Sequence, residues 1–131
     1  MPEAERELIL AAYRAMERQD WEALFANAQA YFTMKPPAGS LAMAEPGREG
    51  AREAMKTFFS PYEAVQIEPL EFRERGDRIA VTFAMRARPH GSTAMVEIRV
   101  GHLWTIRYGK LAGLEIFPQR EKAFEALERR R

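Results

Sequence analysis

The chain contains no cysteine among its 131 residues, and it has only two histidines. The absence of cysteine excludes disulfide bonds, thiolate zinc sites and cysteine nucleophiles. A metal site would therefore have to be built from two histidines and carboxylates. We expect neither a metal nor another cofactor.

The chain also lacks a large excess of charge of one sign, because 20 basic residues face 19 acidic ones. Such a balance argues against the basic surface of a nucleic-acid-binding protein. No apolar run approaches the roughly 20 residues that span a bilayer. The beginning, "MPEAERELIL", is acidic and lacks the basic region and cleavage site of a signal peptide. We therefore expect a cytoplasmic protein with no nucleic-acid or membrane partner.

What remains is a composition typical of a globular protein, with 47% hydrophobic and 30% charged residues. A chain of this length suits one compact domain and is too short for two ordinary ones. The sequence shows no internal repeat and no low-complexity segment. We expect a single domain over residues 1–131.

The first half of the chain has helical periodicity. Apolar residues at helical spacing predict a helix over residues 3–17, and a second helix follows from Trp21 with Asp20 as its N-cap. The segment 30–35 has strand-like content, and the loop 36–47 after it holds three prolines and two glycines. A third helix is predicted over residues 48–59, where Ser60 and Pro61 end it. Whether the loop 36–47 closes a pocket is left open.

The second half alternates between apolar and polar residues instead. One strand follows the turn at Gly76 and Asp77, a second carries His102, and a third contains Leu114 and Ile116. A terminal helix is predicted over residues 120–128. Helices followed by antiparallel strands indicate an α+β fold, in which the helices cover one face of the sheet. The other face is expected to stay charged.

Five segments carry a resemblance to a known family: "RQDWEAL", "PGREGAREAMKTFF", "RGDRIAVTF", "GHLWTIRYGKLAGLEIF" and "REKAFEAL". In this order the chain resembles the nuclear-transport-factor-2-like superfamily, and within it the SnoaL-like group that includes ketosteroid isomerase relatives. The resemblance implies a cone-shaped, strongly curved antiparallel sheet. Three N-terminal helices would cover its concave face, and a short C-terminal helix would follow. It also implies an apolar pocket and a homodimer.

The catalytic carboxylates of these relatives have no counterpart here. Ketosteroid isomerase relatives place a carboxylate base at the end of the first strand, where this chain has Lys35, Pro36 and Pro37. Limonene epoxide hydrolase relatives need an Asp-Arg-Asp arrangement. Here no acid follows Arg78 on its strand, and the last acid position is Ile116 or Gln119. Both chemistries therefore lose residues that they require.

His102 and Tyr13 remain as candidate catalytic residues. Alternation places His102 in the apolar row of its strand and Gly101 in the polar row, so His102 is predicted to face the concave side. There it would be either a general acid or base, or a neutral polar group in an apolar pocket. Tyr13 either assists it or only packs in the core. The predicted pocket lining comprises Met16, Phe25, Phe58, Phe59, Phe83, Met85, Val100, His102, Trp104, Leu114 and Ile116.

Three functions are compatible with these residues. The first is a noncatalytic SnoaL-like domain that binds a small apolar or amphipathic molecule, and the missing carboxylates favour it. The second is an isomerase, cyclase or dehydratase that uses His102 as general acid or base. The third is a dimeric protein-interaction adaptor acting through the charged sheet face, which carries Arg86, Arg88, Glu97, Arg99 and Arg107.

Overall fold

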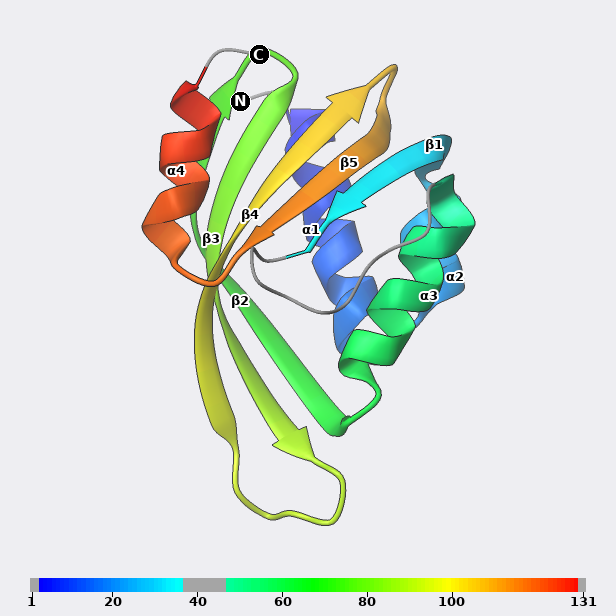
Figure 1. Cartoon of the computed structure of the whole chain (residues 1–131), viewed down its shortest axis with the longest axis vertical. Helices are drawn as coiled ribbons and strands as arrows, with labels where there is room; N and C mark the ends of the chain where they lie inside the picture. The colour runs from blue at the N-terminus through cyan, green and yellow to red at the C-terminus, as the bar shows by residue number, and fades with distance from the viewer. Residues whose placement is uncertain (1–2, 37–46, 130–131) are drawn as a thin grey trace.

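The structure is a computed structural model that describes residues 3–36 and 47–129 (Figure 1). Its helices and strands follow the order expected from the sequence, with one further strand before the turn at Gly76. They are α1 (Glu3–Arg18), α2 (Trp21–Ala26), β1 (Ala28–Lys35), α3 (Gly47–Phe59), β2 (Tyr62–Arg75), β3 (Arg78–Pro89), β4 (Val96–Arg107), β5 (Lys110–Phe117) and α4 (Arg120–Glu128).

The helices α1 and α2 form a helical hairpin (Figure 1). Gln19 has a positive φ of 53°, which lets the chain reverse directly after α1. The side chain of Asp20 accepts a hydrogen bond from the backbone N–H of Ala23 at 3.1 Å, so the predicted N-cap of α2 is confirmed. Among the described helices, none has both the length and the apolar character needed to cross a bilayer.

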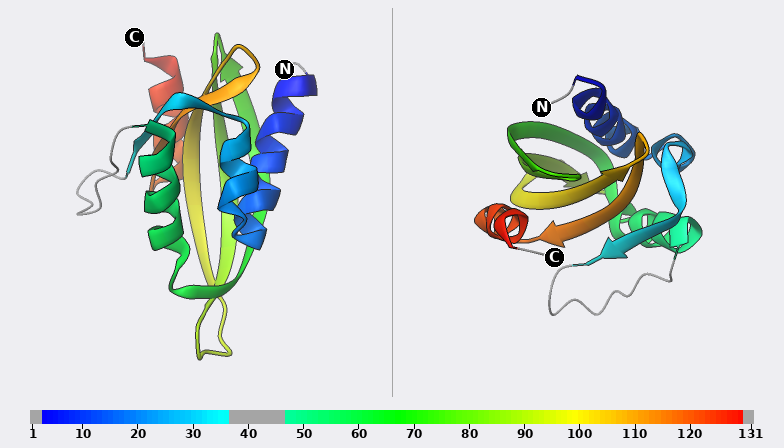
Figure 2. Two further views of the ribbon diagram at one scale, coloured as in Figure 1. Left: turned by 90° about the vertical axis from the view of Figure 1, so that its right-hand side faces the viewer. Right: turned by 90° about the horizontal axis from the view of Figure 1, so that it is seen from above.

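The five described strands form one curled sheet in the order β1-β5-β4-β3-β2. Its strands β2 to β5 pair antiparallel, as predicted for β3 to β5, whereas β1 pairs with β5 in parallel. Since α3 and three strands separate β1 from β5 in the sequence, no hairpin turn sets the direction of β1. The helices α1, α2 and α3 lie on one side of the curl and α4 lies on the other (Figures 1 and 2).

Alternation along β3 and β4 is preserved, but burial changes along their length. In the row that faces α1 to α3, Phe83 is 2% exposed and Trp104 is 1% exposed. Val96 belongs to the same row of β4 and is 46% exposed. The lower part of the β3–β4 hairpin extends past the helices, and this explains the exposure of Val96 (Figure 1). The helices therefore bury the inner row of β3 and β4 near Phe83 and Trp104 but leave the end of this row at Val96 exposed.

The outer face of the sheet is not charged throughout, and that expectation is wrong where α4 packs. A second apolar cluster lies there, because the small residues of α4 bring the helix close to β3 and β4. A Cβ atom added at Gly101 would lie 2.8 Å from Ala123 Cβ and 2.9 Å from the Arg120 carbonyl oxygen. The buried members of the cluster are Ala80, Leu103, Ala123, Ala126 and Leu127.

The edge strand β2 is partly covered by the end of α1. Glu17 Oε2 accepts a hydrogen bond from the backbone N–H of Ile67 at 2.7 Å. Gln19 Nε2 donates one to the carbonyl oxygen of Tyr62 at 3.0 Å. Two side chains from α1 and the α1–α2 turn thus take the place of a neighbouring strand at these positions of the edge.

Candidate functional site

An apolar cavity of about 60 Å³ lies between the helices and the inner face of the sheet. It is larger than the space of roughly 10–15 Å³ that one water molecule occupies. His102 contributes the one polar side chain among its described lining residues. Eight of the predicted pocket residues border this cavity: Met16, Phe58, Phe59, Phe83, Met85, Val100, His102 and Ile116.

The other predicted pocket residues lie in the surrounding core. Phe25, Trp104 and Leu114 are buried but do not border the cavity. Phe25, for example, packs edge-on against Phe32 at a ring-centroid distance of 5.5 Å. Periodicity identifies the buried face of an element but not which part of that face borders a hollow.

Three lining residues were absent from the predicted pocket: Met55, Ile67 and Ile98. Met55 belongs to the apolar face of α3, and Ile98 stands in the same row of β4 as His102. The same periodicity that placed their neighbours in the predicted pocket lining would also have placed these two residues there. Ile67 lies on β2, paired with Met85 across the β2–β3 ladder.

Three side chains join in a buried polar chain beside the cavity. The indole N–H of Trp104 donates a hydrogen bond to Tyr13 Oη at 2.9 Å. Tyr13 Oη lies 2.9 Å from His102 Nδ1 in a further hydrogen bond. These contacts join α1 to β4 across 89 residues of sequence. Both residues proposed for catalysis are therefore in direct contact, although Tyr13 itself does not border the cavity.

Burial keeps both titratable members of this chain neutral. His102 is 5% exposed, and desolvation lowers its pKa to about 3. Tyr13 is 2% exposed, and desolvation raises its pKa well above the ordinary value, a shift that the hydrogen bond from Trp104 reduces. At neutral pH the pair is an uncharged imidazole beside an uncharged phenol. His102 is consequently a weak base and Tyr13 a weak acid.

Aromatic contacts fix the orientation of these rings. The ring centroids of Phe83 and His102 are 4.4 Å apart in a tilted arrangement, and those of Tyr13 and Trp104 are 5.9 Å apart edge to face. The edge-to-face arrangement of Tyr13 and Trp104 is a favoured one for aromatic pairs. The imidazole is therefore held from one side by the Tyr13 hydroxyl and from another by the Phe83 ring.

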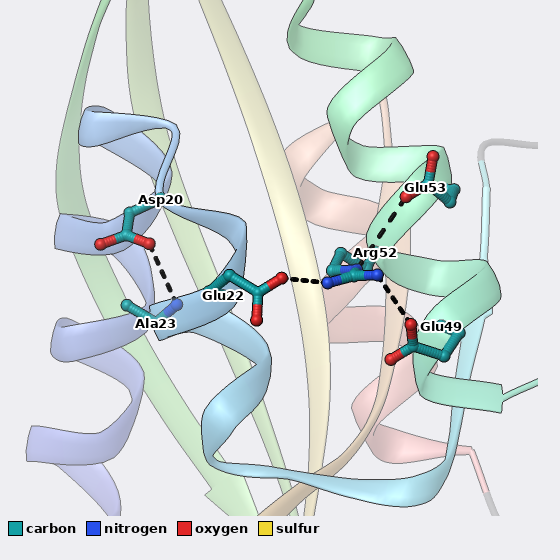
Figure 3. A network of polar contacts seen from close by, with 6 residues as sticks. All are labelled: Asp20, Glu22, Ala23, Glu49, Arg52 and Glu53. Atoms are coloured by element: carbon teal, nitrogen blue, oxygen red, sulfur yellow. Dashed lines mark hydrogen bonds and ion pairs between the residues drawn. The ribbon is translucent and has the colours of Figure 1, made fainter.

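The helical wall of the cavity is attached to α2 by Arg52. Its guanidinium forms ion pairs with Glu22 of α2 and with Glu49 of α3, the latter at 2.7 Å (Figure 3). Glu53 Oε2 lies 3.9 Å from Arg52 Nε. Because α3 also carries Met55, Phe58 and Phe59, this cluster holds the apolar wall in place. Its solvent exposure limits what each pair contributes to stability.

No carboxylate borders the cavity within the part of the chain that the structure describes. Lys35 is exposed at the end of β1, and Pro37 and most of the loop 36–47 lie outside the described residues. Residues 3–36 and 47–129 also contain no group of three histidines, aspartates or glutamates that could hold a metal ion. The site offers neutral hydrogen bonding and apolar contact.

The charged residues of the outer sheet face pair with one another at the surface. Arg99 Nε lies 3.5 Å from Glu97, and Arg86 Nε lies 3.9 Å from the same carboxylate. Arg88 pairs with Glu63 at 3.3 Å, and Arg107 with Asp77 at 3.1 Å. Their acidic partners neutralise part of the positive charge that a partner protein would meet on this face.

Comparison with solved structures places this geometry among known folds. The protein TerC, co-crystallised with polyporic acid, shares 24% identity at a TM-score of 0.75, over 95% of this chain and 97% of that one. An NTF2-like protein of unknown function from Burkholderia pseudomallei K96243 shares 17% identity at a TM-score of 0.76, over 98% and 100% of the two chains. A putative SnoaL-like polyketide cyclase from Jannaschia sp. CCS1 shares 14% identity at a TM-score of 0.74, over 98% and 94%.

The sequence itself identifies the family. No curated protein sequence matches the chain. Residues 9–114 match the SnoaL-like domain family, and this range includes every helix and strand from α2 to β4 together with most of α1 and β5. The curled sheet and the helices on its inner side agree with that match. The chain belongs to the SnoaL-like domain family.

Proposed function

We propose that this domain binds a small apolar or amphipathic molecule in the cavity beside His102 and does not itself transfer protons. The observation that carries the proposal is the composition of the wall, in which ten described apolar side chains surround one neutral imidazole. Mainly apolar hollows with a few polar groups are typical of small-molecule sites. Three of the lining residues are methionines, whose flexible side chains adapt to different ligand shapes.

The alternative is an isomerase, cyclase or dehydratase that uses His102 as general acid or base and Tyr13 as its assistant. The hydrogen bond between these two residues favours it. A general base works best with a pKa near the operating pH, whereas burial lowers the pKa of His102 to about 3. The solved structure of the epoxide hydrolase/cyclase-like enzyme SalBIII is similar at 21% identity, which supports a shared fold alone. We therefore place binding before catalysis.

A matched pair of variants tests binding in the cavity. Val100 and Val96 stand in the same inward row of β4, but only Val100 borders the cavity, and Val96 is 46% exposed. We expect native mass spectrometry of the freshly purified protein to detect a retained small molecule in the wild type and in Val96→Phe. Val100→Phe, which fills the cavity, should lose it. Equal retention by both variants would place the ligand elsewhere.

The adaptor alternative and the homodimer are tested by a separate measurement. Multi-angle light scattering after size-exclusion chromatography reports the mass of the particle in solution. We expect a homodimer of the 15.1 kDa chain. A strictly monomeric particle that still retains its ligand would remove the dimeric adaptor as an alternative and leave the binding function unaffected.

A further inference from the structure

His102 Nε2 is a polar atom without a hydrogen-bond partner among residues 3–36 and 47–129, and its ring borders the cavity. We infer that the ligand of this cavity is a neutral molecule with a hydrogen-bond acceptor, such as a carbonyl or ether oxygen. It binds with the oxygen at His102 Nε2–H and its apolar part directed toward Phe58 and Ile98. The inference rests on the proposed binding function and adds the chemical class and the orientation of the ligand.

The direction of the buried hydrogen bonds determines which ring nitrogen carries the proton. The indole N–H of Trp104 can only donate, so Tyr13 Oη accepts from it. The one hydroxyl hydrogen of Tyr13 then has His102 Nδ1 as its acceptor, because no other acceptor for it is found among the described residues. A neutral imidazole that accepts at Nδ1 carries its hydrogen on Nε2. Tyr13 is thus a positioning residue that selects the tautomer.

The resulting Nε2–H group defines what the ligand must supply. The Nε2 atom keeps some surface open to the cavity. A ligand that covers this donor without supplying an acceptor leaves it unpaired, so a ligand that brings an acceptor is preferred over one that does not. The remaining described lining side chains contain no oxygen or nitrogen, and methionine sulfur is only a weak acceptor. Since Nε2 carries a hydrogen, it cannot accept from a ligand hydroxyl or amine. The site thus distinguishes acceptors from donors.

The same wall disfavours charged ligands. No lysine, arginine, aspartate or glutamate is among the described residues that line the cavity. An anion would exchange its hydration for a single neutral hydrogen bond, and an ammonium ion would find no acceptor at all. Only a neutral molecule enters this environment without losing the solvation of a charge.

Exposure along β4 gives the orientation. His102 is 5% exposed, Val100 and Ile98 are half-buried, and Val96 is 46% exposed, all in one row. Six residues of strand span roughly 20 Å. Phe58, which is 47% exposed, lies on the cavity wall contributed by α3. The apolar surface thus continues from the imidazole outward, and an apolar tail would follow it away from His102.

The test uses three small probes that share a five-membered ring: cyclopentanone, methylenecyclopentane and cyclopentanecarboxylate. Binding is followed through the ¹³C-methyl NMR signals of Met16, Met55 and Met85, which line the cavity. We expect cyclopentanone to bind about tenfold more tightly than the alkene, which lacks the acceptor. The carboxylate should bind more weakly than either.

Two variants of His102 separate the hydrogen bond from packing. His102→Leu, which has no donor, should bind the ketone and the alkene equally. His102→Gln retains an N–H donor and should restore part of the preference for the ketone. Equal binding of both neutral probes to the wild type, or tighter binding of the carboxylate, would overturn the inference while leaving binding in the cavity intact. If none of the probes shifts the methionine signals, the proposed binding function fails as well.

Tyr13→Phe tests the selection of the tautomer, with Tyr108→Phe as the matched control because Tyr108 is 91% exposed. In protein labelled with ¹⁵N-histidine, we expect the wild type and Tyr108→Phe to carry the His102 hydrogen on Nε2. Tyr13→Phe should give a mixture of tautomers and lose at least threefold of its preference for the ketone. A wild-type hydrogen on Nδ1 would overturn the assignment, and a merely structural role of Tyr13 would leave the tautomer unchanged.

Discussion

Gly101 and His102 are neighbours on β4 and face two different interiors. On the inner side, His102 borders a hollow of about 60 Å³ and takes part in a buried polar chain with Tyr13 and Trp104. On the outer side, Gly101 lies against α4, where an added Cβ would come within 2.8 Å of Ala123 Cβ. One side has unfilled space and polar groups, whereas the other is closely packed and apolar.

This difference indicates which changes each side tolerates. The outer cluster consists of small and aliphatic residues in close contact, so its stability should depend on volume. The inner side has room for changes in volume, but its hydrogen bonds must remain satisfied and its imidazole neutral. Three sets of measurements test whether the two sides differ in this way.

The largest effect is expected from Gly101→Val. The new side chain would meet Ala123 Cβ and the Arg120 carbonyl oxygen, and the latter is backbone that cannot move without displacing α4. Overpacking of this kind lowers the free energy of unfolding by about 3 kcal/mol. Urea denaturation followed by circular dichroism measures the loss.

The control for this variant lies on the same strand. Val100→Ile adds a single methylene group to the inner row beside the hollow, and we expect a change below about 1 kcal/mol. If Gly101→Val had the same free energy of unfolding as the wild type, the close approach of α4 to β4 would be contradicted. A loss at Val100→Ile as large as that at Gly101→Val would remove the difference between the two sides.

The second effect is a pH dependence that arises on the inner side alone. Burial lowers the pKa of His102 to about 3 in the folded chain, compared with about 6.5 in the unfolded one. The unfolded chain therefore binds a proton that the folded chain does not bind between these pH values. The free energy of unfolding is therefore highest above pH 6.5 and falls as the pH is lowered toward 3. The expected loss between pH 6.5 and 4.5 is about 2 kcal/mol.

Urea denaturation at a series of pH values measures this dependence, and two variants assign it. His102→Phe should be less stable at neutral pH but should lose the decline that begins near pH 6.5. His90→Gln should keep the decline, because His90 lies on the exposed hairpin between β3 and β4. The same decline in all three proteins would show that another group is responsible.

The smallest effect is expected from a volume-conserving exchange made once on each side. Met55→Leu alters the wall of the hollow, and Leu103→Met alters the packed outer cluster. Such exchanges change stability by less than about 1.5 kcal/mol. We expect about 0.5 kcal/mol for Met55→Leu and about 1 kcal/mol for Leu103→Met, as measured by thermal unfolding. A reversed order would mean that the hollow is the less adaptable side.

The sequence predicted most of the elements because they depend on local patterns, although no strand was named where β2 lies. The helix over residues 120–128 agrees with α4, and the Asp20 cap starts α2 as expected. Alternation also placed His102 on the inner face, because a shift by one residue would have inverted every side chain of β4.

The contacts that define the site were not predictable in the same way. The hydrogen bond from Tyr13 to His102 spans 89 residues, so it depends on how α1 crosses the curled sheet rather than on a local pattern. Gly101 was assigned to a polar row because its neighbours Glu97 and Arg99 are charged, whereas the approach of α4 decides its environment. Local patterns thus predict which face of a helix or strand a residue lies on. Which residues of other elements it contacts there depends on how elements distant in the sequence pack together.

The coverage of β2 by Glu17 and Gln19 affects how the protein behaves at high concentration. An exposed edge strand is a template on which a strand of another molecule can grow, and this is a common route to aggregation. Here the N–H of Ile67 and the carbonyl oxygen of Tyr62 are already taken by side chains of the same molecule. An incoming strand would have to displace both before it could pair there. The end of α1 therefore disfavours the addition of a strand from another molecule at this part of the edge.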